Sequence, residues 1–203
     1  MKFKIKTKKG FSIGEVLLAL FVLTFGITVS IALMSGSMQD TMKSRDLLVA
    51  SMLSQEGTEL MRNLRDNNVT EKSSKTGERS DAFLEFPKGD GACSVDYEYV
   101  TDTPNNANFL NESLDCTSPS YDLYLNEIDD GSVSGIKFYS HSGDDLTKFK
   151  RKIIVGNEGV GKKSIVSMVV WNGRDFPNSK EECNIGQDCT YSETILTAWI
   201  NFE

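Results

Sequence analysis

The residues of this sequence that could do chemistry are few, and none of them completes a reaction centre. His141 is the only histidine, so a catalytic dyad or a histidine-based metal cluster would have to be built around one imidazole. It falls in the polar segment 140–145, where we expect it to be exposed. The sequence carries no enzyme signature, and we predict no catalytic residue and no cofactor.

The segment 156–164, GNEGVGKKS, comes close to a phosphate-binding P-loop without completing it. The motif needs Ser or Thr directly after its Lys, and here Lys163 intervenes before Ser164. A P-loop also joins a strand to a helix, whereas a β-rich run follows this segment. We therefore predict a hairpin turn.

Two acidic pairs lie beside glycines and could in principle hold calcium. They are Asp129-Asp130 and Asp144-Asp145. Neither pair has the spaced acidic pattern of an EF-hand loop. Such pairs more often lie in solvent-exposed turns than in calcium sites, and we predict no metal site.

The first 39 residues combine a basic segment with a long apolar one. Five lysines fall within residues 1–9, which hold no acid, and residues 16–39 carry no charge. About 20 apolar residues span a bilayer core as a helix, and preceding lysines keep their end in the cytoplasm. We therefore predict one membrane-spanning helix with the remainder exported. Conventional signal cleavage near 30–32 is the alternative, although the run exceeds the about 7–15 residues of a secretory signal.

Glu15 is the only charge in the apolar block 11–39. An acid costs about 2.5–3.5 kcal/mol at the centre of a membrane helix and less near its ends. The apolar run itself offers no cation, so we expect a cation from a neighbouring molecule to neutralise this carboxylate. The alternative is a one-pass anchor in which the acid is incidental.

The segment 8–20, KKGFSIGEVLLAL, resembles the class III signal of type IV pilins and type II secretion pseudopilins. Those precursors carry a basic leader ending in Gly, then Phe, an acid four residues further on, and an apolar helix. Gly10, Phe11 and Glu15 match this order, and Lys8 and Lys9 end the basic leader. Gly14 departs from the bulkier apolar residue common at its position. The resemblance covers roughly the first 30 residues.

This resemblance implies a processing site and a function. Prepilin peptidase would cut between Gly10 and Phe11 and methylate the new amine of Phe11, which Glu15 of a neighbouring subunit would neutralise. The chain would be a structural subunit, and a minor one, of a type IV pilus or type II secretion-like pseudopilus. It would wait in the cytoplasmic membrane with its N-terminus in the cytoplasm, and then join an extracellular or periplasmic filament.

The partners implied are other pilin or pseudopilin subunits, prepilin peptidase, the inner-membrane assembly platform and the membrane. Two alternatives come from other classes of function. One is a ligand-binding pilin-like protein for DNA uptake or adhesion, and the other is a membrane-anchored protein that never polymerises. The resemblance does not say which machine the chain serves.

Four cysteines lie in the second half of the chain: Cys93, Cys116, Cys183 and Cys189. With a membrane-targeting N-terminus, an even number suggests disulfides outside the cytoplasm. Sequence permits three pairings, and we favour Cys93–Cys116 and Cys183–Cys189 because each closes a local loop. Four reduced, buried thiols are the alternative. The spacings do not suit structural zinc.

Beyond residue 39 the helical pattern becomes amphipathic. One stripe recurs at spacings of seven and four, and its members are Met42, Val49, Leu53, Leu60 and Leu64. We predict a helix from Phe11 to about Arg65, ended by Asp66-Asn67-Asn68, whose stripe is covered by a sheet. Residues 68–81 are polar and predict a surface loop. Gly26, Gly36 and Gly57 each weaken a helix by about 1 kcal/mol.

The last third of the chain predicts successive strands with short turns. Runs rich in β-branched and aromatic residues cover 136–140, 149–156, 164–171 and 193–202. The alternation of Val95, Tyr97 and Tyr99 with acids adds an earlier strand. The fold class predicted is α+β, a pilin fold by resemblance, with a long N-terminal helix on a C-terminal antiparallel sheet. Its parts are a leader 1–10, an assembly helix 11–39, an amphipathic half 40–66 and a head 67–203.

The net charge of -7 conceals an asymmetry that bears on partners. Once the five leader lysines are set aside, 17 Lys and Arg face all 29 Asp and Glu. Nonspecific binding to nucleic acid depends on neutralising phosphates with basic side chains. The acidic balance therefore argues against nucleic acid as a partner.

Overall fold

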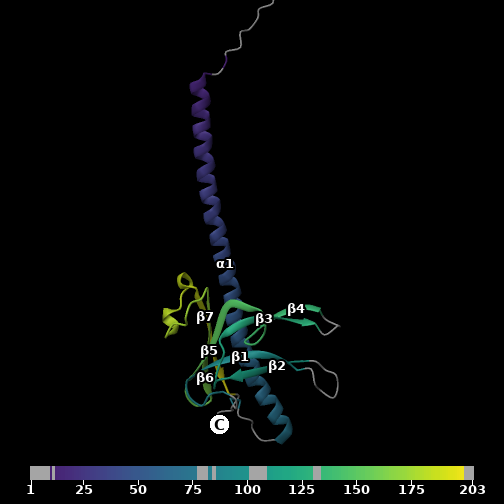
Figure 1. Ribbon diagram of the computed structural model, residues 1–203. Helices are drawn as coiled ribbons and strands as arrows, with labels where there is room; N and C mark the ends of the chain where they lie inside the picture. The colour runs from purple at the N-terminus through teal and green to yellow at the C-terminus, as the bar shows by residue number, and fades with distance from the viewer. Residues whose placement is uncertain are drawn as a thin grey trace, which may run out of the picture. The chain divides into compact units, whose positions relative to one another are not determined.

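The computed structural model describes residues 10, 12–76, 82–83, 86–100, 109–129 and 134–198. It consists of one long helix followed by seven strands, an α+β fold with an antiparallel sheet as predicted (Figure 1). The chain forms two units, Met1–Arg45 and Asp46–Glu203, and the helix runs through the boundary between them.

The helix α1 spans Ile13–Thr76. The prediction that it ends at 66–68 is wrong, because it continues for two further turns through residues predicted as a loop. Asp and Asn are only mildly unfavourable inside a helix, and no glycine or proline occurs between Asn68 and Thr76. The next glycine in the sequence is Gly77, and glycine is the residue that most often ends a helix.

In the first unit the side chains of α1 are exposed from Ile13 to Ser44. They include large apolar residues such as Phe21, Leu33 and Met38, at 71, 71 and 56 % exposure. Among the described residues this is the one helix that is long and apolar enough to cross a membrane. That finding agrees with the predicted membrane-spanning segment in length and composition.

The sheet belongs to the second unit, and every pairing in it is antiparallel. Its strands are β1 (Gly91–Val100), β2 (Phe109–Asp115), β3 (Asp122–Asp129), β4 (Ser134–Ser140), β5 (Leu146–Asn157), β6 (Lys162–Trp171) and β7 (Cys189–Thr197). Two short 3-10 helices, η1 (Lys180–Glu182) and η2 (Ile185–Gln187), precede β7. The predicted strands 136–140, 149–156 and 164–171 lie within β4, β5 and β6. The predicted 193–202 overlaps β7, and its last four residues fall outside the described part.

One edge of β5 pairs with β6 along its length, and the other edge is shared by two hairpins. β1 joins the C-terminal part of β5 through Cys93↔Ile153, and β3 joins the N-terminal part through Asp122↔Lys150. β1 also pairs with β2, and β3 also pairs with β4, so two separate hairpins extend away from β5 (Figure 1). We call the place where they part the fork.

The core forms where the second part of α1 lies on the sheet. Leu53, Leu60 and Leu64 of the predicted stripe are buried, as the pattern required, while Met42 is 62 % exposed. Gly57 marks the closest approach of helix and sheet. A Cβ on Gly57 would lie 2.3 Å from Ser167 Oγ and 2.9 Å from Ile153 Cδ1. The sequence presented this glycine only as a weak point of the helix, whereas it makes room for the sheet.

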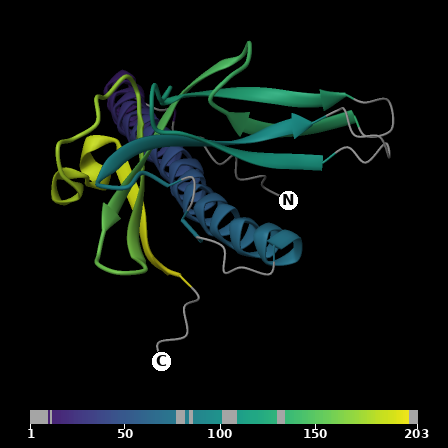
Figure 2. The ribbon, with the colours of Figure 1, turned by 90° about the horizontal axis from the view of Figure 1, so that it is seen from below.

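The opposite face of β5 and β6 is covered by the loop that precedes β7. Met168 and Val170 pack there against Cys183 and Cys189, with Phe176 beside them. Figure 2 shows this yellow loop and α1 on opposite sides of the β5–β6 strands. β6 is therefore buried on both faces, which explains its near-continuous apolar run.

The segment that resembled a P-loop is a hairpin turn, as predicted. It joins β5 to β6, and Glu158 N–H donates to the carbonyl of Lys162 across it (3.2 Å). The turn residue Gly159 has φ of 110°, a conformation that favours glycine.

Candidate functional site

The predicted processing site is described only at Gly10, because Lys8, Lys9 and Phe11 lie outside the described residues. Gly10 is exposed, and no heavy atom lies within 4 Å of the position a Cβ would take.

Glu15 has a partner that the sequence analysis missed. The Ser12 N–H donates to Glu15 Oε2 (2.9 Å), and the Gly14 N–H donates to Ser12 Oγ (3.2 Å). This arrangement is a variant of the capping box, in which the N–H of Gly14 takes the place of that of Glu15, and it satisfies two of the backbone donors left over at a helix start. The signal was present as Ser-x-x-Glu at 12–15 ahead of an apolar run. The carboxylate is thus built into the beginning of α1 and remains exposed.

Three hydroxyl groups in the apolar part of α1 donate to the backbone of the helix itself. Thr24, Thr28 and Ser30 each donate to a carbonyl of the preceding turn, at 2.9, 2.8 and 2.8 Å. A polar group that found no partner in hydrocarbon would cost several kcal/mol. These bonds make the surface of α1 suited to contact lipid or another helix.

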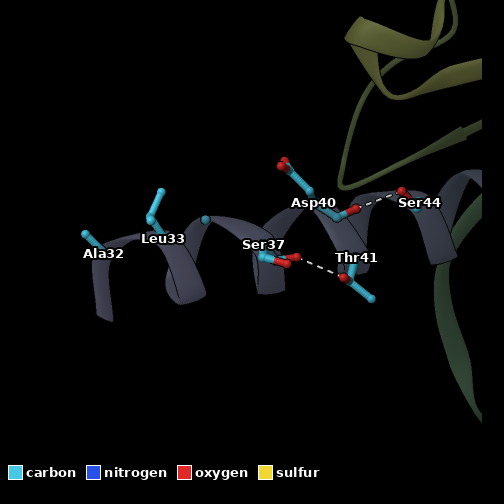
Figure 3. Close-up of a pocket in the computed structure, with 7 residues that line it drawn as sticks. Ala32, Leu33, Ser37, Asp40, Thr41 and Ser44 are labelled. Carbon is cyan, nitrogen blue, oxygen red and sulfur yellow. Dashed lines mark hydrogen bonds between the residues drawn. The ribbon is translucent and has the colours of Figure 1, made fainter. Parts of the chain in front are cut away.

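A shallow open groove follows one side of α1 at residues 32–44 (Figure 3). Its lining residues are Leu33, Asp40 and five small or short-chained residues, namely Ala32, Gly36, Ser37, Thr41 and Ser44. The Thr41 and Ser44 hydroxyls turn back to the carbonyls of Ser37 and Asp40, both at 2.8 Å. Small residues of this kind let a second helix approach closely.

In the head, the fork is occupied by Arg151, which is 0 % exposed. Its backbone N–H donates to the carbonyl of Tyr121 (2.8 Å) on the β3 side. Its Nη2 donates to the carbonyl of Val95 (2.8 Å), just beyond the point where β1 leaves β5. The guanidinium therefore pairs a backbone acceptor of β1 close to where the strands separate.

The same guanidinium reaches α1 and two acids. Nη1 lies 3.5 Å from the carbonyl oxygen of Leu53 and 3.5 Å from Glu56 Oε1, and Nη2 lies 3.9 Å from Asp96 Oδ1. Its Nε is buried without a hydrogen-bond partner. Arg151 thus links helix, sheet and fork through one buried charge.

His141 is buried in this fork, and the prediction that it is exposed is wrong. It is 8 % exposed, and its backbone N–H donates to Asp96 Oδ2 (2.6 Å), which joins the end of the β3–β4 hairpin to β1. Its Nδ1 lies 3.1 Å from the carbonyl oxygen of Asp122. Residues 141–145 do form the predicted loop after β4, but the first of them, His141, is used to close the fork.

Burial moves the two titrating groups of the fork in opposite directions. It raises the pKa of Asp96 to about 6, against the lowering effects of the His141 N–H and of Arg151, while Glu56 adds to the rise. It lowers the pKa of His141 to about 4, together with the positive charge of Arg151. The histidine is therefore neutral at physiological pH, and Asp96 is ionised above about pH 6.

A cavity of about 210 Å³ opens beside these residues, and we call it the fork pocket. Its lining comprises Ser94, Asp96, Asp115, Ser118, Ser120, His141 and Ser142. Asp115 is exposed, and its Oδ1 accepts from the Thr117 and Ser118 N–H groups (2.8 and 3.1 Å), which lowers its pKa. Chemically the lining can accept many hydrogen bonds. No functional prediction from the sequence had pointed to it.

The Cys93–Cys116 disulfide stands at the base of the hairpin that carries one wall of this pocket. It bridges the residues flanking the Ser94↔Asp115 pair, with a Cα–Cα distance of 4.1 Å. The second disulfide, Cys183–Cys189, closes the loop over β6, with a Cα–Cα distance of 5.1 Å. This is the pairing that the sequence favoured among three.

The alternating pattern of β5 could have indicated from the sequence that Arg151 is buried. Phe149, Ile153 and Val155 are the inward positions of that strand, and Arg151 falls on the same face. A charge on the buried face of a strand indicates an internal partner. Its partners come from β1 and α1, so no local pattern could identify them.

Of the two acidic pairs considered for calcium, Asp144-Asp145 is the one that lies wholly within the described residues. Asp144 and Asp145 are exposed, and Asp130 lies outside the described residues. Within the described ranges no group of three or more His, Cys, Asp or Glu residues could hold a metal ion.

Comparison of the chain with protein-family models, with curated proteins and with solved structures gives no match.

Proposed function

We propose that this chain is a filament subunit of the type IV pilin and pseudopilin kind, assembled through α1 after removal of a basic leader. The observation that carries the proposal is the exposed apolar surface of α1 over residues 16–39, with Glu15 as the one charge at its beginning. Such a surface must be covered by lipid while the chain is in the membrane, and by lipid or neighbouring helices after assembly.

The proposed assembly step is electrostatic. Cleavage between Gly10 and Phe11 would create a cationic amine, and Glu15 of a neighbouring subunit would lie against it. Two unit charges 4 Å apart attract by about 4 kcal/mol at an effective dielectric constant of about 20. A buried acid without this partner would be costly, so the pair would also set the axial position of each added subunit.

The capping box bears on this step. The Ser12 N–H uses Glu15 Oε2, and a carboxylate has a second oxygen that can accept further bonds. Glu15 could therefore hold its own helix start and a neighbour's amine together. The side chain would be oriented before assembly, which lowers the entropic cost of pairing.

The groove at 32–44 supports contact between neighbouring helices. Gly36 and Ser37 sit in its middle and leave the backbone accessible, and a Cβ on Gly36 would meet nothing within 4 Å. Close packing of helices in lipid depends on such small residues. The groove would accept a larger side chain from a neighbouring α1.

The localisation proposed is a single pass through the cytoplasmic membrane, followed by an extracellular or periplasmic filament. The five leader lysines support the orientation. The disulfide-bearing, acidic head supports export to an oxidising compartment. Its size favours a minor subunit over a bulk one.

The first experiment is the intact mass and N-terminal peptide map of the chain from its native membrane. A chain that begins at methylated Phe11 is the expected result. A chain that begins at Met1, or one cut after the apolar run, would overturn the filament proposal and leave a plain anchor or a secreted domain.

A matched pair of substitutions tests the assembly step. Glu15→Gln keeps the shape of the side chain and removes its charge, and we expect it to be absent from sheared filaments. Glu59→Gln, the same change at an exposed acid of α1 that does not line the groove, should assemble normally. Normal incorporation of Glu15→Gln would show that the charge has no role in assembly.

A further inference from the structure

The fork pocket has a composition that selects among ligands. Four of its seven lining residues are serines, two are aspartates and one is histidine. Among its described lining residues there is no Lys or Arg to bind a phosphate or carboxylate, and no aliphatic, phenyl or indole side chain to cover an apolar surface. A ligand recognised there would be polar and would not be an anion.

Two of the lining residues carry buried atoms that have no hydrogen-bond partner, His141 Nε2 and Asp96 Oδ1. Buried polar atoms are nearly always paired, so each such atom indicates a missing partner. The carbonyl of Asp122 can only accept, which places the ring hydrogen of His141 on Nδ1. In the neutral ring Nε2 is then an acceptor, as is Asp96 Oδ1. Asp96 Oδ1 faces Arg151 Nη2 at 3.9 Å, beyond hydrogen-bond distance, so Nε2 and, more weakly, Oδ1 call for a donor.

The charges around the pocket also favour a positively charged donor. Arg151 is a cation that contacts the lining residue Asp96, and both Asp96 and Glu56 already lie within 4 Å of it. Asp115 remains as an exposed carboxylate on the other wall, with its pKa lowered by two backbone N–H groups. The pocket is therefore negative in balance and rich in acceptors.

We propose that the fork pocket binds the primary ammonium group of a small polar ligand about the size of one sugar ring. An ammonium group donates three hydrogen bonds and accepts none, which complements a wall of carboxylate, imidazole and hydroxyl acceptors. The cavity of 210 Å³ corresponds to about seven waters at about 30 Å³ each. This site lies in the head and does not depend on whether the chain forms a filament.

His141 provides a reporter at the site itself, because it is the only histidine. The full chain, labelled with ¹³C and ¹⁵N in histidine alone and held in detergent micelles, should give one set of ring resonances. Glucosamine is then titrated near neutral pH, with glucose as the neutral compound of nearly the same shape. We expect glucosamine to shift the His141 signals saturably and glucose to leave them in place.

Two asparagine variants locate the charge that matters. In Asp115→Asn the remaining Oδ1 can still accept from the Thr117 and Ser118 N–H groups, so the local turn is kept. We expect it to weaken glucosamine binding about fivefold, as for the loss of one exposed charge pair. Asp90→Asn is the matched control, because Asp90 also accepts a backbone N–H, from Asn157 (3.0 Å), and does not line the pocket. It should bind as the unchanged chain does.

Several outcomes would overturn the proposal. No shift with either sugar would mean that water alone fills the pocket. Equal shifts with both would assign recognition to hydroxyl groups and not to an ammonium. Unchanged affinity in Asp115→Asn, or equal loss in Asp90→Asn, would show that the effect comes from the overall acidity of the head.

Discussion

The two parts of α1 show how one helix serves two surroundings. In residues 13–44 large apolar side chains are exposed, and the hydroxyl groups at Thr24, Thr28 and Ser30 turn back to the helix backbone. In residues 46–69 one face, with Ala50, Leu53, Leu60, Met61 and Leu64, is buried by the sheet, while Leu48 and Met52 remain exposed. The helical backbone is the same in both, so the difference lies in what is available to cover the side chains.

This difference teaches that residue type alone does not set the energetic role of a position. A leucine and a glycine can be compared directly between the two parts, and a charged residue that contacts the second part can be compared with one in the first. In each pair, the residue at the packed position should be more sensitive to substitution. The unfolding of the head, measured on the full chain in detergent micelles, separates the two roles. Buried positions in 46–69 should change it, and exposed positions in 13–44 should not.

The largest effect is expected for the buried charge that binds the second part of α1 to the sheet. Arg151→Met would leave Asp96 without its cation and the Val95 carbonyl without its donor. Removal of one partner of a buried pair costs about 3–5 kcal/mol. Urea unfolding followed by tryptophan fluorescence would measure it, since Trp171 is buried in the core. Glu15→Gln, at an exposed charge, should leave the midpoint in place, and equal midpoints for both variants would contradict this account.

The same leucine truncation in each part gives the next contrast. Leu53 is 2 % exposed and Leu33 is 71 % exposed. Leu53→Ala should lower the free energy of unfolding by about 2–5 kcal/mol, because it removes apolar contact and leaves a cavity. Leu33→Ala should change it by less than about 0.5 kcal/mol. A loss with Leu33→Ala comparable to that with Leu53→Ala would mean that the first part of α1 is also packed in the folded head.

Glycine to alanine should have opposite effects in the two parts. At Gly57 the added Cβ would meet Ser167 and Ile153 within 3 Å, and overpacking of this kind costs about 1–3 kcal/mol. At Gly36 the added Cβ meets nothing, and alanine favours the helix by up to about 1 kcal/mol. Circular dichroism and urea unfolding of both variants would measure the effects. Stabilisation of the head by Gly57→Ala would show that helix and sheet are less close than described.

The smallest effect concerns pH and the fork. Asp96 faces Arg151, Glu56 and the His141 N–H, and its pKa rises from 3.8 to about 6. The folded state thus holds this proton more tightly than the unfolded chain. The resulting stability is present below about pH 4 and is lost as the pH rises to about 6.

His141, which faces Arg151 and Asp122, has the opposite dependence. Its pKa falls from 6.5 to about 4, so its stability contribution is present above about pH 6.5 and is lost as the pH falls to about 4. The two contributions oppose each other in the intact chain. The Asp96→Asn variant lacks this titrating carboxyl group. Its urea midpoint, relative to that of the unchanged chain, should therefore rise steadily from pH 4 to pH 6. A constant difference over this interval would show that Asp96 titrates normally.

Much of the fold could be predicted because it rests on local patterns. The apolar run, the stripe at Leu53, Leu60 and Leu64, and the β-rich segments near the C-terminus each have a period that reports one side of an element. The helix end was misplaced because Asp66-Asn67-Asn68 resembles a stop signal, yet nothing there prevents helical backbone. The turn at 156–164 was predicted correctly because a P-loop requires a helix that the sequence does not supply.

The fork could not be predicted, because its members are far apart in the chain. Arg151 is 55 residues from Asp96, and His141 is 45 residues from it. They meet only because two hairpins share one edge of β5, which is a matter of strand order and register.

What the sequence by itself determined is the division into an exposed apolar helix and an antiparallel, disulfide-bearing head. Helical and strand periods, charge asymmetry and the capping residues at 12–15 are all local, and local interactions suffice to specify them. Only the tertiary structure decided that His141 is buried, that Arg151 joins α1 to the sheet, and that a glycine at 57 is needed. Burial depends on which distant segments cover a residue, and no single stretch of sequence contains that information.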